Sequence, residues 1–516
     1  MAPRQKKNGS KKPVLETEED FYDDATEKEE QAERWALSDV KKTIRQYALA
    51  FNSYEQGLNA PSSTVGGSYH IYYNQTRLLL KMYSDYIAND GSVNILQYVD
   101  LTDMGNLDML FKPLPIITER FELAIAKFRD ACSWDIYFNL LTCYFSQLED
   151  YSELSGDQIL ELYERFKSTA RRVIQLHLEE LESWEAPSDT ATPAPLDAVP
   201  TVDGNSGHSA SEDNELEVME MQDEITAKTL LDTLVVCYRC IATLIELLVE
   251  SRNGTFAAIN DVQANYLEDD TQQFKLQLDA VVREEAGLNL GSLETDELQL
   301  AVWSIDGLIV VSSTGFEGLK TFIAGIADSG RDTCVDKLLI AVDLLHLVRQ
   351  HPKNNLKHNQ ARLWAVCTEA GRLLSTVEAK LAQKRQDTIS GILKENDNEL
   401  SPVVFKLCEV MISRSDNELY RHLIKATEAS HGDPAAAKTA GILLRNAQVL
   451  LKNASTIAQQ PCGFREYISD KLKRNYIYKQ ATERLGFMEN GATTSTILEL
   501  AQEHPFYNAQ NPVRQL

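Results

Sequence analysis

The chain has 516 residues, with 77 acidic and 51 basic side chains and a formal net charge of −26. Its length predicts roughly two to four domain-sized units or one continuous helical solenoid. The strong negative charge argues against general binding to phosphate backbones and favours basic partner surfaces, although acidity also serves solubility alone.

Most of the eight cysteines lie within apolar helical patterns, which is typical of buried thiols in a reducing compartment. Cys237 and Cys240 have C-x-x-C spacing in mid-helix without a second pair, which favours a structural role. The N-terminus lacks the apolar run of a signal peptide, and no charge-free apolar run is long enough to span a bilayer. We therefore expect a soluble protein of the nucleus and/or cytoplasm that is not secreted and has no membrane partner.

Residues 1–26 have a composition that cannot bury a core. An acidic run at 16–24 follows a basic cluster that consists of Arg4, Lys6, Lys7, Lys11 and Lys12. We predict a disordered basic and acidic tail. The lysine cluster also has the pattern of a nuclear address, a pattern that often arises by chance.

The stretch from Trp35 to Pro61 predicts a capped amphipathic helix. Ser38-Asp39 can accept the free N–H groups of a first turn. Apolar side chains then recur at three- and four-residue spacing, which marks one helical face: Ile44, Tyr47, Phe51, Tyr54 and Leu58. The small residues Ala50 and Gly57 on this helix would let a neighbouring helix approach closely.

A second stretch, residues 124–151, has a related pattern. Ala124, Phe128 and Ala131 repeat a small-aromatic-small spacing, and an aromatic helix begins near Trp134. A further helix is predicted over residues 158–181.

Together these stretches resemble the tetratricopeptide repeat (TPR) family, whose units of about 34 residues pair two helices. Thr43, Tyr47 and Ala50 take the small, aromatic and small places of a second helix. In the next unit, the first-helix places fall on Tyr137, Phe138, Asn139, Leu140 and Tyr144. Several positions depart from the family pattern, so the resemblance covers residues 35–175 as divergent units: Ser38, Leu141 and Leu148 stand where glycine is usual.

The resemblance implies an all-α fold, a TPR-like helical-hairpin solenoid with an N-terminal repeat region and a C-terminal helical repeat region. It also implies a concave surface that binds a protein partner. The partner-binding residues it suggests are Tyr47, Asn52, Tyr54, Asn139 and Tyr144. For Asn139 a capping or surface role is the open alternative.

Composition divides the rest of the chain. Residues 27–183 form the predicted N-terminal domain, and 184–222 read as a disordered acidic linker rich in Pro and Ser. Residues 223–500 form the predicted C-terminal helical repeat domain, and 501–516 an irregular tail. Within the C-terminal domain we expect helices at 225–250, 255–284, 294–328, 331–351, 358–383, 388–413, 415–430, 433–457 and 464–485.

Catalytic and metal motifs are absent from the sequence. His346, His351 and His358 are interrupted by a proline, and Glu268-Asp269-Asp270 lacks the third carboxylate of a D-D-x-x-D magnesium motif. The chain contains neither a phosphate-binding P-loop nor a nucleophile elbow. We predict no catalytic residues, no metal and no cofactor.

Two basic zones stand out against the acidic whole, at 349–363 and 465–484. The second is a candidate contact patch that contains Arg465, Lys471, Lys473, Arg474 and Lys479. Lysines interleaved with tyrosines can bind phosphates and bases, but more often they form a solvated helix face. Nucleic acid is therefore not favoured as a direct ligand.

The favoured hypothesis is a non-catalytic scaffold, adaptor or dedicated chaperone for a basic client such as a ribosomal protein or a histone-like chain. The alternatives are a structural subunit of a translation, transcription or transport complex, and an all-helical enzyme with an unrecognised site. The sequence leaves the oligomeric state open.

Overall fold

A computed structural model of the chain describes residues 15–36, 38–60, 64–88, 96, 99–105, 107–185, 225–254, 256, 258–284, 292–327, 334–351, 359–391, 400–462 and 466–489. Every regular element within these ranges is a helix, which confirms the all-α prediction. The α-helices are α1 (Glu18–Ala36), α2 (Val40–Leu58), α3 (Val65–Met82), α4 (Leu114–Phe128), α5 (Trp134–Glu149), α6 (Gly156–Glu185), α7 (Ala227–Asn253), α8 (Asp261–Glu284), α9 (Ser292–Ala327), α10 (Val335–Gln350), α11 (Gln360–Ile389), α12 (Leu400–Ser430), α13 (Pro434–Ala458) and α14 (Ile468–Glu489). Short π and 3₁₀ segments join some of them: η1 (Tyr83–Ala88), η4 (Thr102–Met104), η5 (Arg129–Ala131) and η6 (Tyr151–Glu153).

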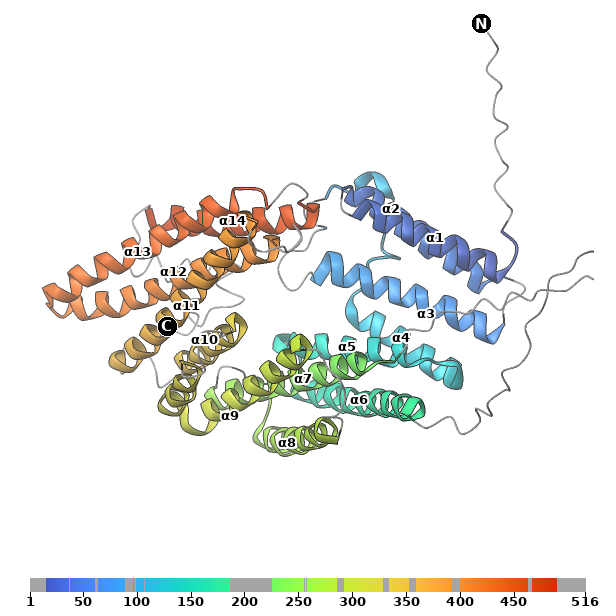
Figure 1. Ribbon diagram of the computed structural model, residues 1–516, viewed down its shortest axis with the longest axis horizontal. Helices are drawn as coiled ribbons and strands as arrows, with labels where there is room; N and C mark the ends of the chain where they lie inside the picture. The colour runs from blue at the N-terminus through green and yellow to red at the C-terminus, as the bar shows by residue number, and fades with distance from the viewer. Residues whose placement is uncertain are drawn as a thin grey trace, which may run out of the picture.

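Helices that follow one another in sequence pack side by side, as in a helical-repeat solenoid (Figure 1). The neighbours are in contact from α1 to α8 and again from α9 to α14. Helix α7 is central because it packs against α5, α6, α8 and α9. The helix therefore joins the first half of the stack to the second.

Side-chain caps begin several helices where the sequence placed them. Asp39 accepts a hydrogen bond from the backbone N–H of Lys42 at 3.0 Å and caps α2, as predicted. Asp433 accepts from the N–H groups of Ala435 and Ala436, and Pro434 occupies the first turn of α13. These caps satisfy N–H groups that lack partners inside the helix.

Gly57 allows the close helix approach that its small size predicted. A Cβ atom at this position would lie 2.7 Å from Ile71 Cδ1 on α3 and 3.1 Å from Phe21 Cβ on α1. The absence of a side chain at this glycine lets three helices meet.

The buried apolar residues form two large clusters. One extends from α1 to the start of α9, and the other extends from the end of α7 to α14. Ala242 and Ile245 of α7 touch both clusters. The core therefore divides along α7 and α9, not at the predicted linker 184–222, since α7 and α8 pack with the N-terminal helices.

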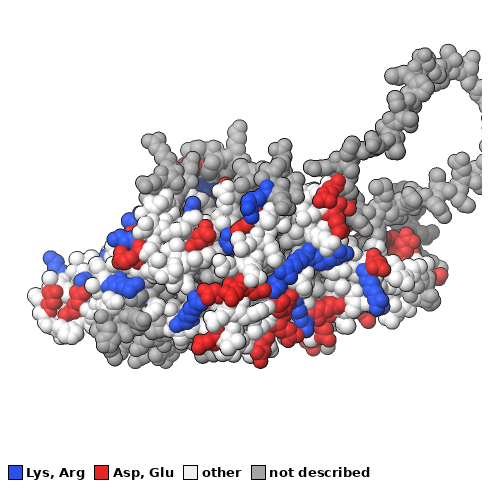
Figure 2. Space-filling model, turned by 90° about the horizontal axis from the view of Figure 1, so that it is seen from below, with Lys and Arg blue, Asp and Glu red and all other residues white. Residues whose placement is uncertain are grey.

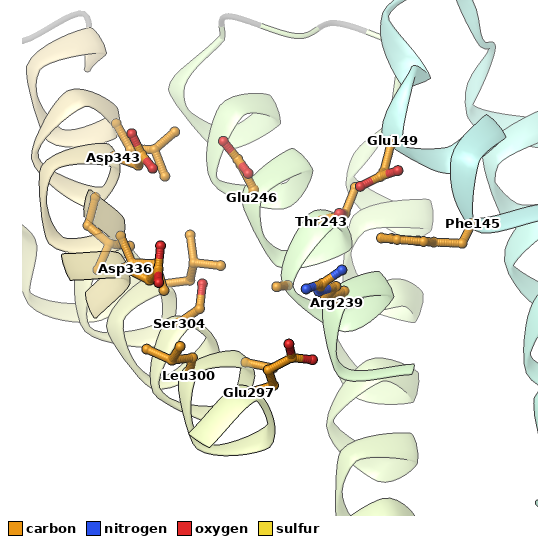
Figure 3. A pocket seen from close by; sticks show the side chains of 16 residues that line it. Phe145, Glu149, Arg239, Thr243, Glu246, Glu297, Leu300, Ser304, Asp336 and Asp343 are labelled. Carbon is orange, nitrogen blue, oxygen red and sulfur yellow. The ribbon is translucent and has the colours of Figure 1, made fainter. Parts of the chain in front are cut away.

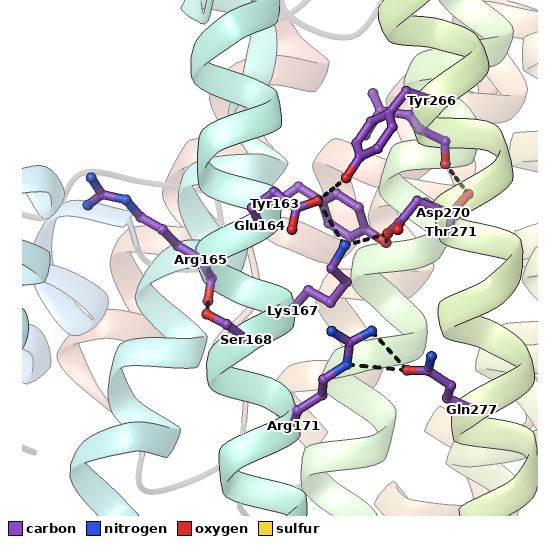
Figure 4. Close-up of polar contacts among 11 residues, drawn as sticks. Tyr163, Glu164, Arg165, Lys167, Ser168, Arg171, Tyr266, Asp270, Thr271 and Gln277 are labelled. Carbon is purple, nitrogen blue, oxygen red and sulfur yellow. Dashed lines mark hydrogen bonds and ion pairs between the residues drawn. The ribbon is translucent and has the colours of Figure 1, made fainter.

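A polar network ties α8 to α6 (Figure 4). The buried Nζ of Lys167 lies 2.7 Å from Asp270 Oδ2 and 2.8 Å from Glu164 Oε1. The Tyr163 hydroxyl also donates to Asp270, at 2.8 Å, and the Tyr266 hydroxyl donates to Glu164. These contacts join helices that lie on either side of the predicted linker.

Helix α9 is broken at Gly315, where φ is 63° and ψ is −144°. The two halves fold back on each other, because the rings of Trp303 and Phe322 stack with their centroids 4.7 Å apart. In a straight helix these residues would be separated by about 28 Å along the axis. Within the described residues, one span, Asp296–Ile326, is long and apolar enough to cross a membrane by length and composition, and 28% of its 18-residue apolar stretch is buried. The break at Gly315 divides this span into about 19 residues before it and about 11 after it, so the second part is too short to cross a bilayer.

Some boundaries differ from prediction. Helix α1 begins at Glu18, inside the predicted tail of residues 1–26, and Glu18 Oε2 accepts a hydrogen bond from the N–H of Thr64 at 2.7 Å. The two helices predicted at 388–413 and 415–430 are replaced by α11, which extends to Ile389, and by one continuous α12. Helix α6 runs to Glu185, while most of the predicted linker and all of the tail 501–516 lie outside the described residues.

Candidate functional site

The predicted partner-binding residues of α2 divide between core and surface. Tyr47 and Tyr54 are buried, and the Tyr54 hydroxyl donates to Glu29 Oε1 of α1 at 2.6 Å. Their spacing marks the face that packs against neighbouring helices, so in this fold they are not available to a partner. Asn52 is exposed on the opposite face and stays a prediction.

The two predicted partner-binding residues of α5, Asn139 and Tyr144, form hydrogen bonds to neighbouring helices. The Asn139 amide donates to the Tyr73 hydroxyl of α3 at 2.9 Å and is half-buried. Tyr144 is buried, and its hydroxyl donates to Glu122 of α4. Tyr144 is thus a core residue, and α3 and α4 separate this pair from the residues of α2.

The predicted basic patch is not one surface. Arg474 is buried, with Nη2 2.9 Å from Glu466 Oε2 and Nη1 donating to the Ala458 carbonyl at 2.8 Å. Lys471 and Lys479 are exposed, and the Nζ of Lys473 lies 5.4 Å from the centre of the Phe405 ring. Arg465 lies outside the described residues. The prediction was wrong for Arg474, because its guanidinium group is buried and binds Glu466 and the end of α13.

On one face of the molecule, acidic and basic side chains are interspersed (Figure 2). On this face, the acidic side chains that contribute to the net charge of −26 do not form a uniform negative surface.

A cavity of about 440 Å³ lies between α5, α7, α9 and α10 (Figure 3). We call it the acidic pocket, because five carboxylates and one arginine line it: Glu149, Glu246, Glu297, Asp336, Asp343 and Arg239. Its remaining wall is largely apolar, with Phe145, Ala242, Leu300, Ala301, Leu308, Ile340, Leu344 and Leu347.

Helical periodicity explains how these side chains converge. The lining positions recur every three or four residues on α7 (239, 242, 243 and 246), on α9 (297, 300, 301, 304 and 308) and on α10 (336, 340, 343, 344 and 347). Each set is one helical stripe. The sequence shows three amphipathic helices, but nothing local indicates that their polar edges meet.

The carboxylates of the pocket differ in how well they are neutralised. Asp336 is paired with Lys406 and lies in the first turn of α10, where the helix dipole favours a negative charge. In the described part of the chain, neither Glu246 nor Asp343 has an ion-pair partner. Among the described residues, the charges of Glu246 and Asp343 are therefore not compensated by an ion pair.

This arrangement shifts the titration of the pocket. The protein around Glu246 raises its pKa to about 7 by desolvation, helped by the charges of Glu250 and Asp343. Desolvation also raises the pKa of Asp343 to about 7. Desolvation raises the pKa of Glu149 too, although the charge of Arg239 opposes this shift. A cation that enters the pocket would relieve the cost of these charges.

Across the described ranges, no group of three or more His, Cys, Asp or Glu side chains is arranged to hold a metal. An organic cation such as a lysine or arginine side chain needs no such coordination geometry, and it suits the apolar wall as well.

Comparison with known proteins gives a consistent family match. Residues 151–313 match the family model described as "YNL193W-like protein middle domain", and residues 330–511 match the "YNL193W C-terminal domain". The chain is 35% identical over 550 residues to "Uncharacterized protein YNL193W" of Saccharomyces cerevisiae, and the match covers 97% of each chain.

Two solved structures were also found in the comparison. One is a "circular tandem repeat protein with novel repeat topology and enhanced subunit contact surfaces", with 10% identity, a TM-score of 0.25, and coverage of 93% of this chain and 97% of that one. The other is a "homology model of the full-length AP-3 complex in an intermediate open conformation", with 12% identity, a TM-score of 0.13, and coverage of 92% and 90%. Both scores are too low to indicate a shared fold, and the TPR resemblance stays an interpretation of the helical hairpins.

Proposed function

The chain belongs to the YNL193W-like family, and we propose that it is a non-catalytic helical scaffold or chaperone that holds a basic segment of a partner protein. The acidic pocket carries this proposal. Glu246, Asp343 and Glu149 would pair with a lysine or arginine side chain, and the apolar wall would contact its methylene groups. A ribosomal protein or a histone-like chain would supply such a segment.

The protonation of the pocket gives the proposed binding a pH dependence. With both pKa values near 7, Glu246 and Asp343 are partly protonated at neutral pH. A bound cation favours their charged forms and releases protons. Affinity for a basic segment should therefore rise between pH 6 and pH 8, with the steepest change close to pH 7.

The test is binding of a fluorescent peptide in which lysines alternate with alanines, measured by anisotropy against the full chain. The variant Glu246→Gln/Asp343→Asn should weaken binding about tenfold, because each partly exposed ion pair contributes about 0.5–1 kcal/mol. The control Glu27→Gln/Glu30→Gln removes two carboxylates from the exposed face of α1. Equal weakening by both variants would show that only net charge matters and would refute the pocket assignment.

An all-helical enzyme is a second candidate, because two carboxylates with pKa values near 7 suit proton transfer at neutral pH. The pocket wall offers the hydroxyl groups of Ser304 and Thr243, but its lining residues include no His or Cys to act as base or nucleophile. Mass spectrometry of the peptide after incubation separates the candidates, since a scaffold returns it unchanged and an enzyme alters its mass.

A structural subunit of a larger complex is the remaining alternative. Moderate salt screens exposed charges and should release a basic client from the acidic pocket. A cellular partner that stays bound in high salt would instead favour an apolar subunit interface.

A further inference from the structure

A second cavity, of about 350 Å³, lies further along α7, α9 and α10, where α11 joins its wall. We call it the basic pocket. Its polar lining residues are Arg252, Asn253, Ser312, His351 and Arg362, and its lining contains no carboxylate. Leu347 borders both pockets. In a chain with a net charge of −26, a cavity wall with two arginines and no acid is unexpected.

Contacts across the wall position Arg252. Its Nη1 donates to the Ser312 hydroxyl at 3.2 Å, and its Nη2 pairs with Glu268 of α8, which lies outside the wall. Arg362 comes from the first turn of α11 and is half-buried. Within the described residues, Arg362 has no carboxylate at ion-pair distance, so none of these residues neutralises its charge.

Gly315 provides the space beside Arg362. Its φ of 63° with ψ of −144° falls in a region that is essentially restricted to glycine. A Cβ atom at this position would lie 3.2 Å from Arg362 Nη2. The same glycine that breaks α9 thus leaves room for the guanidinium group.

The partial charges of the helix ends at this cavity do not cancel the charge of its arginines. The C-terminal ends of α7, of the first half of α9 and of α10 reach the cavity, and the second half of α9 and α11 begin there. A helix C-terminus carries about −0.5 elementary charge and an N-terminus about +0.5, so these five ends together contribute about −0.5. Arg252 and Arg362 add two positive charges, of which Glu268 offsets one. The cavity therefore remains positive before His351 is considered.

We infer that the basic pocket binds the phosphate group of a phosphate monoester. Guanidinium groups bind phosphate oxygens through paired N–H donors, and a phosphate also accepts from a neighbouring hydroxyl such as that of Ser312. The apolar side chains of Val249, Val311 and Leu347 would contact the organic part of the ligand.

The nearby acidic pocket disfavours a polyanion as the ligand of the basic pocket. Both cavities lie along the same helices, and about 9 Å of helix axis separates Glu246 from Arg252 on α7. A polyanion such as a nucleic acid that entered the basic pocket would extend toward the carboxylates and be repelled. A single phosphate group avoids this repulsion.

The test is calorimetric titration of the full chain with phenyl phosphate and, separately, with inorganic phosphate, in chloride at matched ionic strength. The wild type should bind phenyl phosphate, and Arg362→Gln should weaken this binding about tenfold or more, because a charged hydrogen-bond donor is lost. The matched control is Arg372→Gln, which removes an exposed arginine from the same helix away from the cavity and should change nothing.

Arg362→Lys tests the geometry, since it keeps the charge but loses the paired donors, and it should bind with intermediate affinity. Circular dichroism checks that each variant is folded. No binding by the wild type, or equal weakening by Arg362→Gln and Arg372→Gln, would overturn the inference. Equal affinity for inorganic phosphate and phenyl phosphate would overturn the assignment to a monoester and leave free phosphate as the ligand.

Discussion

Replacing Lys167 by Met tests whether an ion-pair network holds α8 against α6. The side chain is almost fully buried between Asp270 and Glu164, at 2.7 and 2.8 Å. Met keeps most of the aliphatic volume and removes only the charge. Asp270 would retain one donor, the Tyr163 hydroxyl at 2.8 Å. Losing one partner of a buried pair costs 3–5 kcal/mol, but Asp270 stays 21% exposed and can gain water, so we expect a loss of about 2 kcal/mol.

The assay is urea unfolding of the full chain followed by circular dichroism at 222 nm, with the midpoint compared between variants. The control is Arg171→Met, one turn further along α6, whose guanidinium group donates to the neutral Gln277 at 3.0 Å. This exposed contact should contribute less than about 1 kcal/mol. If Lys167→Met and Arg171→Met lowered the midpoint equally, the network would not be what fixes α8, and apolar packing alone would account for the contact.

Three further outcomes follow from single positions. Burial lowers the pKa of His177 from 6.5 to about 4. As pH falls below 6.5, the unfolded chain therefore becomes protonated at this residue before the folded chain does, and the free energy of unfolding decreases until pH reaches about 4. His177→Phe should remove about 2 kcal/mol of the decrease in unfolding free energy between pH 7 and pH 5, and an unchanged pH profile would refute this assignment. Gly57→Val should lower the free energy of unfolding by about 2–3 kcal/mol, because the new side chain would clash with Ile71. Gly441→Ala, on an open helix surface, should instead raise it by about 0.5–1 kcal/mol. Thermal melts should therefore show a lower melting temperature for the first variant and a higher one for the second. Asp433→Ala should cost about 1 kcal/mol through loss of the α13 cap, and an unchanged melting temperature would contradict that role.

Local signals in the sequence were enough to locate most helices. Asp39 and Asp433 cap helices because short side-chain oxygens reach nearby N–H groups, a relation contained within four residues. The start of α1 was missed because it depends on a distant contact, in which the buried carboxylate of Glu18 accepts a hydrogen bond from Thr64. From composition alone, the same acidic residues are typical of a disordered tail.

The candidate binding site was harder to predict for a related reason. The aromatic spacing that suggested Tyr47 and Tyr54 as groove residues is also the spacing of a buried face, and burial shows that they belong to the core. The acidic pocket gathers residues from Phe145 to Leu347, on four helices. Its carboxylates look like ordinary surface charges in the sequence, because only helix packing brings Glu246 and Asp343 into one cavity.

Carbodiimide coupling between a lysine-rich peptide and the full chain, with the linked carboxylates identified by mass spectrometry, tests the central claim most directly. The reaction forms an amide only where a lysine amine lies against a carboxylate. We predict that the peptide links first to Glu246, Asp343 and Glu149. Links spread over the exposed acids of α1 and α8, with the acidic pocket unlabelled, would contradict it.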